Sequence, residues 1–105
     1  MSRFPTTHMW TDAQTTVGGV VTFYPTDDGT GSGNPLFAVI DAVQLTPELN
    51  TGSISAVPFC AVKTVSADRK TIIANVGSGT VLGVLGATVV AVPDGTKVHA
   101  LVLGH

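Results

Sequence analysis

The last third of the chain, residues 71–103, places the strongest limit on what this sequence can fold into. Its apolar runs TIIANV, TVLGVLGATVVAV and KVHALVL are rich in Val, Ile and Thr, and each run stops at a turn signal. Such residues fit a pleated, half-buried surface, whereas Gly, Pro and Asp interrupt it. We therefore expect β-strands here, separated by turns at Gly77-Ser78-Gly79 and at Pro93-Asp94-Gly95-Thr96.

The PDGT sequence of residues 93–96 is the sharpest turn signal in the chain. Pro presets φ for the first turn position, Asp can bond its own backbone, and Gly accepts a positive φ. We expect residues 89–92 and 97–103 to pair as a β-hairpin across this turn. A second hairpin is expected around the polar turn at residues 66–70, which leads into Thr71.

Composition favours an all-β fold in a single domain. The chain has 105 residues, and only 11% of them are charged, against about 25% in an average soluble domain. Long helices need Glu and Lys on their solvent face, but this chain has one Glu and three Lys. We predict one small β-sandwich or barrel over residues 15–105, with six to seven mostly antiparallel strands.

Three further apolar runs are expected to be strands, namely residues 15–24, 36–45 and 56–66. In the first run, Val17, Val21 and Phe23 have the spacing of residues that share one face. Asp41 is the polar exception in the second run, and it is expected either at a strand edge facing solvent or hydrogen-bonded to a loop. Pro58 cannot donate to a ladder, so it predicts an edge or a bulge for the third run.

Residues 1–14 show no periodicity and read as an N-terminal arm or tail. One interpretation is a loose terminus, which is common unless the segment is tied down. The other is an extended arm in which Phe4, Met9 and Trp10 contact a neighbouring subunit, because exposed aromatic residues are enriched at interface hot spots.

Charge and hydropathy exclude several function classes. The net charge is −2, and only five residues are basic, which is too few for the basic face that nucleic acid requires. No apolar run reaches the roughly 20 residues that a membrane span needs. The first ten residues have no apolar signal-peptide core, which predicts a protein made and used without export. Cys60 is the single cysteine, so no internal disulfide can form.

The residues that could carry chemistry do not form a recognisable constellation, and we predict no enzyme, no cofactor and no metal. Gly77-x-Gly79 resembles a dinucleotide-binding turn, but the next segment is too rich in Gly and β-branched residues to be the required helix. Cys60 has the neighbours of a small buried residue, and His99, inside a strand, is expected to be a hydrogen-bonded structural residue.

The loop at residues 26–35, TDDGTGSGNP, offers a second candidate site. Asp27 and Asp28 could bind Ca²⁺ through carboxylate and carbonyl oxygens. The ligand order of an EF-hand is absent, however, and no closing Glu follows. Turn-forming Asp residues are therefore the favoured interpretation.

The low charge has a consequence for the surface. A free small domain keeps itself soluble with about 25–35% charged surface residues, whereas charge is depleted at interface cores. We therefore expect a component of an assembly. Lys63, Arg69 and Lys70 cluster around one hairpin, where they could meet an acidic patch on a partner or protect an edge strand from aggregation.

Two segments, FYPTDDGTGSGNPLFAVIDAVQLTPELNTGS and VPFCAVKTVSADRKTIIANV, resemble small virion proteins of tailed bacteriophages. The chain is most similar to all-β head decoration (cement) proteins in its length, its Gly/Thr-rich turns and its S-x-D-x-K-T hairpin. The resemblance implies a subunit that binds the outside of a phage head, contacts the major capsid protein and forms a homo-oligomer, with a trimer favoured. The alternative is a glycan- or receptor-binding module of a phage tail or fibre, with the TDDGTGSGN loop as its contact.

Overall fold

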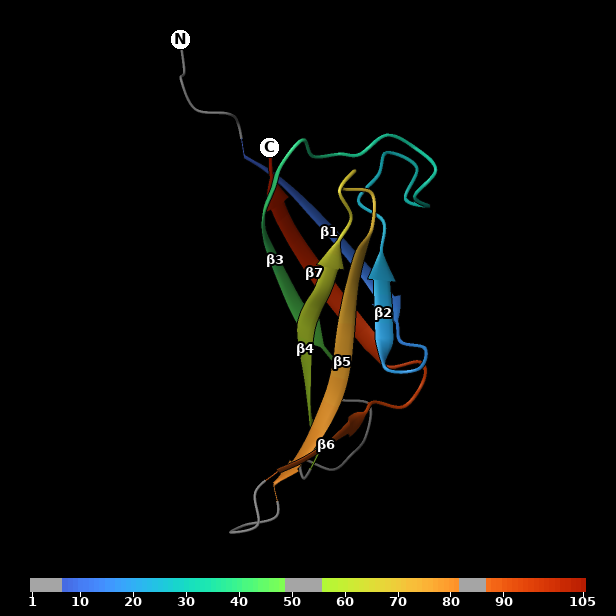
Figure 1. Ribbon diagram of the computed structural model, residues 1–105, viewed down its shortest axis with the longest axis vertical. Helices are drawn as coiled ribbons and strands as arrows, with labels where there is room; N and C mark the ends of the chain where they lie inside the picture. Colours follow the sequence, from blue (N-terminus) through green and yellow to red (C-terminus); the bar gives the residue numbers. More distant parts are fainter. Residues whose placement is uncertain (1–6, 49–55, 82–86) are drawn as a thin grey trace.

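The computed structural model describes residues 7–48, 56–81 and 87–105, which form seven strands in two antiparallel sheets (Figure 1). The predicted all-β, sandwich-like fold is therefore confirmed. The strands are β1 His8–Thr15, β2 Val20–Phe23, β3 Ile40–Pro47, β4 Ala56–Val65, β5 Ile72–Val81, β6 Ala87–Ala91 and β7 Lys97–Gly104. The described part of the chain has no helix that could cross a membrane.

Each sheet has one central strand, β7 in the first sheet and β5 in the second. One sheet has the order β1-β7-β3, and the other has the order β2-β5-β4. Two strands pair with different parts of β5: β2 bonds residues 72–75, and β6 bonds residues 77–81. Among the described strands β4 pairs only with β5, so it is an edge strand, one of the two positions that Pro58 predicted.

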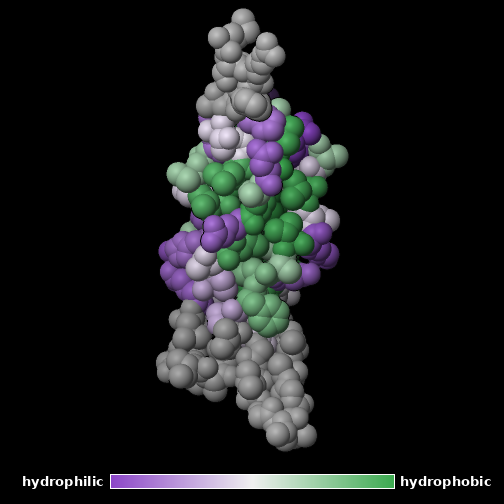
Figure 2. Space-filling model, turned by 90° about the vertical axis from the view of Figure 1, so that its left-hand side faces the viewer, coloured by the Kyte–Doolittle hydropathy of each residue, from purple (hydrophilic) through white to green (hydrophobic). Residues whose placement is uncertain are grey.

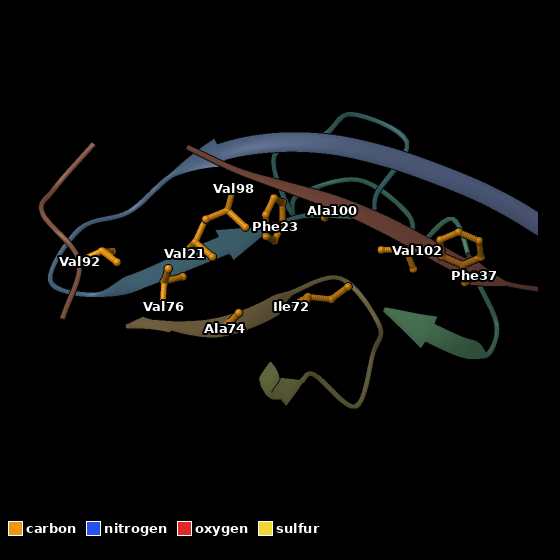
Figure 3. Packing of buried hydrophobic residues seen from close by; sticks show 10 residues of the cluster. All are labelled: Val21, Phe23, Phe37, Ile72, Ala74, Val76, Val92, Val98, Ala100 and Val102. Carbon is orange, nitrogen blue, oxygen red and sulfur yellow. The ribbon is translucent and has the colours of Figure 1, made fainter. Parts of the chain in front are cut away.

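The core lies between the central strands of the two sheets (Figure 3). β7 alternates strictly, and its buried residues Val98, Ala100 and Val102 point toward the opposite sheet. Ile72, Ala74 and Val76 of β5 are the buried residues on the other side. Val21, Phe23, Phe37 and Val92 complete the buried cluster.

The predicted hairpin across the PDGT turn is wrong. β6 bonds β5 in one sheet, whereas β7 bonds β1 and β3 in the other, so residues 92–96 carry the chain between the sheets. Hydrogen bonds to Thr16 hold the turn there. The Thr16 hydroxyl donates to the Pro93 carbonyl at 3.0 Å and accepts from the Thr96 backbone N–H at 3.2 Å. Gly18 N–H also donates to Oδ1 of Asp94 at 2.9 Å.

The turn that contains Thr16 joins β1 in one sheet to β2 in the other. The hydrogen bonds of Thr16 therefore connect this crossing to the one at residues 92–96. Thr16 and Thr96 are both buried at this point. Replacing the Thr16 hydroxyl with a methyl group removes both of its hydrogen bonds, each of which contributes about 0.5–1.5 kcal/mol. The Pro93 carbonyl keeps the Thr96 hydroxyl as a donor at 2.7 Å, so the turn is weakened and not left without bonds.

We expect Thr16→Val to lower the free energy of unfolding by about 1–3 kcal/mol, because the shape is kept and the hydroxyl is lost. Urea unfolding followed by circular dichroism measures the difference. Thr15→Val is the matched control, since Thr15 is exposed on β1, and it should change stability by less than about 0.5 kcal/mol. Equal effects of the two changes would show that the Thr16 bonds do not hold the crossings together.

Two other local expectations are corrected by the pairing. Gly77-Ser78-Gly79 is not a turn, because β5 runs through it with β4 on one side and β6 on the other. Its position in a doubly paired strand excludes the phosphate-binding turn that the Gly pattern resembled. Val21 and Phe23 share the buried face as predicted, but Val17 does not, since it lies in the turn before β2 and is 72% exposed.

The boundary predicted for the N-terminal arm is also wrong. His8–Gln14, expected in an arm, belongs to β1 and pairs along its length with β7. The sequence HMWTDAQT has few β-branched residues, so the strand is determined by the ladder that β7 offers rather than by local preference. Phe4 lies outside the described residues.

Candidate functional site

The sandwich has two open sides, where the edge strands of its two sheets face each other. β1 and β2 flank one side, and β3 and β4 flank the other. On the β1–β2 side, Asp12 and Gln14 pair with Ala100 and Val98 and therefore point between the sheets, as does Trp10, which pairs with Val102. Nε2 of Gln14 donates to Oδ2 of Asp12 at 2.9 Å, and this bonded pair occupies the side.

The β3–β4 side is apolar, and we call it the β3–β4 edge. Its inward-facing residues are identified by the buried residues with which they pair. They are Ile40, Val43, Leu45 and Pro47 on β3 and Cys60, Val62 and Val65 on β4. Val62 and Val65 remain 41% and 40% exposed, although their ladder partners Ala74 and Ile72 are fully buried. Figure 2 views this side and shows hydrophobic atoms concentrated along its middle.

A bulge with a charged residue interrupts each strand of the β3–β4 edge. Asp41 lies in the register shift between Ile40 and Ala42 of β3, and Lys63 lies in the shift between Val62 and Thr64 of β4. Bulges and charges on edge strands disturb the row of free backbone groups that another strand would use. The edge is therefore suited to contacts through side chains rather than to the addition of a long strand.

Asp41 lies at a strand edge facing solvent, the first of the two alternatives expected for it, and its hydrogen-bond partner is the residue after β7 and not a loop. It is exposed on an edge strand, and its Oδ2 lies 3.0 Å from Nδ1 of His105, the last residue. The backbone of His105 also accepts from Ala38 and Val39 at 2.8 Å, so the segment before β3 is fixed to the end of β7. The strand expected over residues 36–45 is observed over Ile40–Pro47.

A second acidic residue, Glu48, directly follows β3. Its Oε1 lies 2.8 Å from Nε2 of His99 on β7, in an exposed pair. The hydrogen bond to His99 holds the pKa of Glu48 below its ordinary value, and the charges of His99 and Lys97 add to this effect. His99 is thus a hydrogen-bonded structural residue, as predicted.

The three basic residues predicted to contact a partner have different roles. Arg69 supports the fold, because its Nε donates to the Phe37 carbonyl at 3.2 Å and its Nη1 donates to the Ala67 carbonyl at 2.8 Å. Lys70 is half-buried in the β4–β5 turn, where its backbone N–H donates to Ser66 and Asp68. Lys63 is exposed on the β3–β4 edge and forms no ion pair with the described residues.

The two residues of β1 predicted to contact a partner lie on opposite faces of its sheet. Met9 pairs with Leu103 on the outer face and is 68% exposed. Trp10 pairs with Val102, is half-buried and packs against the domain's own core. Of the predicted interface residues that the structure describes, Met9 and Trp10 therefore do not share one patch, and the β3–β4 edge itself was not predicted.

The soft nucleophile and metal candidates do not form a reactive site. Cys60 points inward from β4, and burial raises the pKa of its thiol, which favours the unreactive protonated form. His99 belongs to the other sheet and points to its outer face. Within residues 7–48, 56–81 and 87–105, no group of three or more His, Cys, Asp or Glu residues could hold a metal ion.

The carboxylates of the loop at residues 26–35 bond the loop itself, as expected of turn-forming Asp residues. Oδ1 of Asp28 accepts from the Thr30 N–H at 2.9 Å and from the Thr26 hydroxyl at 2.8 Å. Oδ1 of Asp27 accepts from the Asn34 N–H at 3.0 Å. The Thr30 and Thr26 bonds hold the pKa of Asp28 well below its ordinary range.

This lowered pKa predicts an acid-sensitive loop. A carboxyl whose pKa is lower in the folded chain stabilises the fold above its unfolded value, about 3.9. That stability is lost as the pH falls toward the folded value. We expect Asp28→Asn to lower the melting temperature at pH 7 and to reduce its decline between about pH 5 and pH 2. Calorimetry over this range measures both, and parallel pH curves for the two proteins would contradict the assignment.

Comparison with known proteins does not add a family. No protein-family model matches the chain, and no curated protein or solved structure matches it either. What this protein binds is therefore inferred from its own surface, and the feature that stands out on that surface is the β3–β4 edge.

Proposed function

We propose that this protein is a structural subunit of a virion, a decoration protein that binds the outside of a phage head and stabilises contacts between its capsid subunits. The observation that carries the proposal is the uncovered β3–β4 edge, where Val62 and Val65 point inward and yet remain about two-fifths exposed. A subunit that functions alone in water gains stability by covering such residues, whereas an assembly subunit covers them with a partner.

The chemistry of the described residues is consistent with this role. Burial raises the pKa of the Cys60 thiol, the loop carboxylates of Asp27 and Asp28 are bonded internally, and the charged share of the chain is 11%. The resemblance to small decoration proteins adds the partner, the major capsid protein, and a location on the virion after synthesis in the host cytoplasm. The alternative, glycan binding by the TDDGTGSGN loop, has less support because the loop uses its own acceptors.

We expect the purified protein to co-sediment with phage heads that lack decoration, and to raise the temperature at which those heads open. Val62→Asp, which places a charge in the apolar part of the β3–β4 edge, should weaken head binding at least tenfold. Thr64→Asp is the matched control, because Thr64 faces outward on the same strand, and it should bind like the parent chain.

Circular dichroism and the melting temperature establish that both variants are folded before binding is compared. A folded parent chain that ignores the heads would overturn the proposal, and selective binding on a glycan array would favour the tail or fibre module instead. Equal head binding by Val62→Asp and Thr64→Asp would show that the β3–β4 edge is not the surface that binds the heads.

A further inference from the structure

Both ion pairs that the described residues form connect β3 to its neighbour β7 (Figure 1), and each contains a histidine. Directly after β3, Oε1 of Glu48 lies 2.8 Å from Nε2 of His99 on β7. Near the start of β3, Oδ2 of Asp41 lies 3.0 Å from Nδ1 of His105, the residue after β7. One histidine–carboxylate pair therefore stands at each end of the same edge strand.

The attachment of β3 to the rest of the fold is one-sided. Among the described strands, β3 pairs with β7 alone, and the bulge at Asp41 shifts the register between Ile40 and Ala42. A bulge leaves a residue unpaired and disrupts the ladder locally. The backbone bonds at this end, such as the one from Val39 to the His105 carbonyl, contain no titratable group. The two side-chain pairs are therefore the part of the attachment that responds to pH.

The chemistry of such a pair fixes the direction of the response. Histidine changes its charge between about pH 5 and pH 8, whereas Asp and Glu are ordinarily ionised over that range. A neutral imidazole can keep one hydrogen bond to a carboxylate. A protonated imidazole adds the attraction of opposite charges, and charge-assisted hydrogen bonds are roughly twice as strong as neutral ones. A histidine–carboxylate pair is therefore strongest at mildly acidic pH.

The surroundings of the Glu48–His99 pair hold one further charge. On the outer face of the sheet, His99 lies between Ala13 of β1 and Thr46 of β3, neither of which titrates. The hydrogen bond to His99 holds the pKa of Glu48 below its ordinary value, and the charges of His99 and Lys97 add to this effect. Glu48 thus stays ionised at mildly acidic pH, and the charge that changes in this pair is that of His99.

The surroundings of the Asp41–His105 pair hold a third imidazole. Gly104, beside His105, pairs with His8 of β1. From the β4–β5 turn, Arg69 donates to a carbonyl of the segment before β3, and its charge does not change with pH. Histidine is therefore the source of any change in charge around Asp41 near neutral pH, and an experiment must separate His105 from His8.

We propose that the two histidine–carboxylate pairs form a pH-sensitive clamp, which holds β3 firmly on β7 at mildly acidic pH and less firmly above neutral pH. The proposal does not depend on the proposed role in a virion. Each pair is exposed and contributes little alone, but the two lie at opposite ends of an eight-residue strand, so their effects add. When the clamp loosens, β3 opens more often and uncovers Ile40, Val43 and Leu45, which pack against the core.

Hydrogen exchange followed by NMR at about pH 5.5 and about pH 8 tests the clamp, with each rate divided by the intrinsic exchange rate at that pH. We expect the protection of the β3 amides to fall about threefold to tenfold between the two conditions, the size of effect that two exposed ion pairs supply. β4 is the reference strand, because it is also an edge strand and neither pair touches it, and its protection should not change.

The double variant Asp41→Asn, Glu48→Gln removes both negative charges and keeps the shape of each pair. Its β3 amides should have the same protection at both pH values, and each single variant should lose part of the parent's pH dependence. His8→Gln is the control, because it removes the third histidine of the chain and leaves both pairs intact, and it should behave like the parent.

Three results would overturn the clamp. The first is a β3 protection in the parent chain that changes no more with pH than that of β4. The second is a parent-like pH dependence in the double variant, or in both single variants if the double variant does not fold. The third is a loss of the pH dependence in His8→Gln, which would assign the effect to the unclamped histidine of β1.

Discussion

The packing of β7 against β5 is the interaction on which the rest of the molecule depends. Each strand is bonded on both sides within its sheet, and each presents small or β-branched side chains to the other. Val98, Ala100 and Val102 on one strand meet Ile72, Ala74 and Val76 on the other (Figure 3). Burial of an aliphatic side chain of the larger kind contributes about 1.5–3 kcal/mol, so this contact is a large favourable term, to which the buried Phe23 and Phe37 add.

The way the chain crosses between the sheets determines which side of the sandwich is sealed. Both described crossings on the β2 side, before β2 and before β7, are joined through the buried hydroxyl of Thr16. On the opposite side, Arg69 and His105 fix the segment that precedes β3 by bonding its backbone. These bonds hold β3 in place but do not cover it, so the β3–β4 edge stays open while the β1–β2 side is closed by polar groups.

The sequence predicts what is local in this fold and misses what depends on distant partners. The alternation in KVHALVL identifies the buried face of β7, and Pro58 correctly indicates an edge strand, because both signals are properties of a single strand. The PDGT turn was recognised, but its hairpin was wrong, since turn chemistry does not decide which sheet receives the next strand. Likewise β1 gave no signal, because its stability comes from the β7 ladder.

The candidate site was hidden from the sequence for the same reason. Val62 and Val65 read as ordinary core residues, and their exposure follows only from the position of the opposite sheet. Of the basic residues that cluster in the sequence, Arg69 turned out to support the fold, whereas Lys63 lies on the open edge. The position of Lys63 in a bulge follows only from the register of β4 against β5, which the sequence does not show.

The low charge of the chain and the β3–β4 edge differ in how strongly they argue for a partner. The outer faces of the sheets carry exposed Thr residues such as Thr11, Thr46 and Thr64, which hydrate without bearing charge. A scarcity of ionised groups is therefore compatible with a surface that faces water, whereas inward-pointing valines that stay about two-fifths exposed are the feature that the proposed partner would cover. The charged bulges then restrict which companion fits, because they block a foreign strand and admit a surface that matches both the apolar middle and the charges beside it.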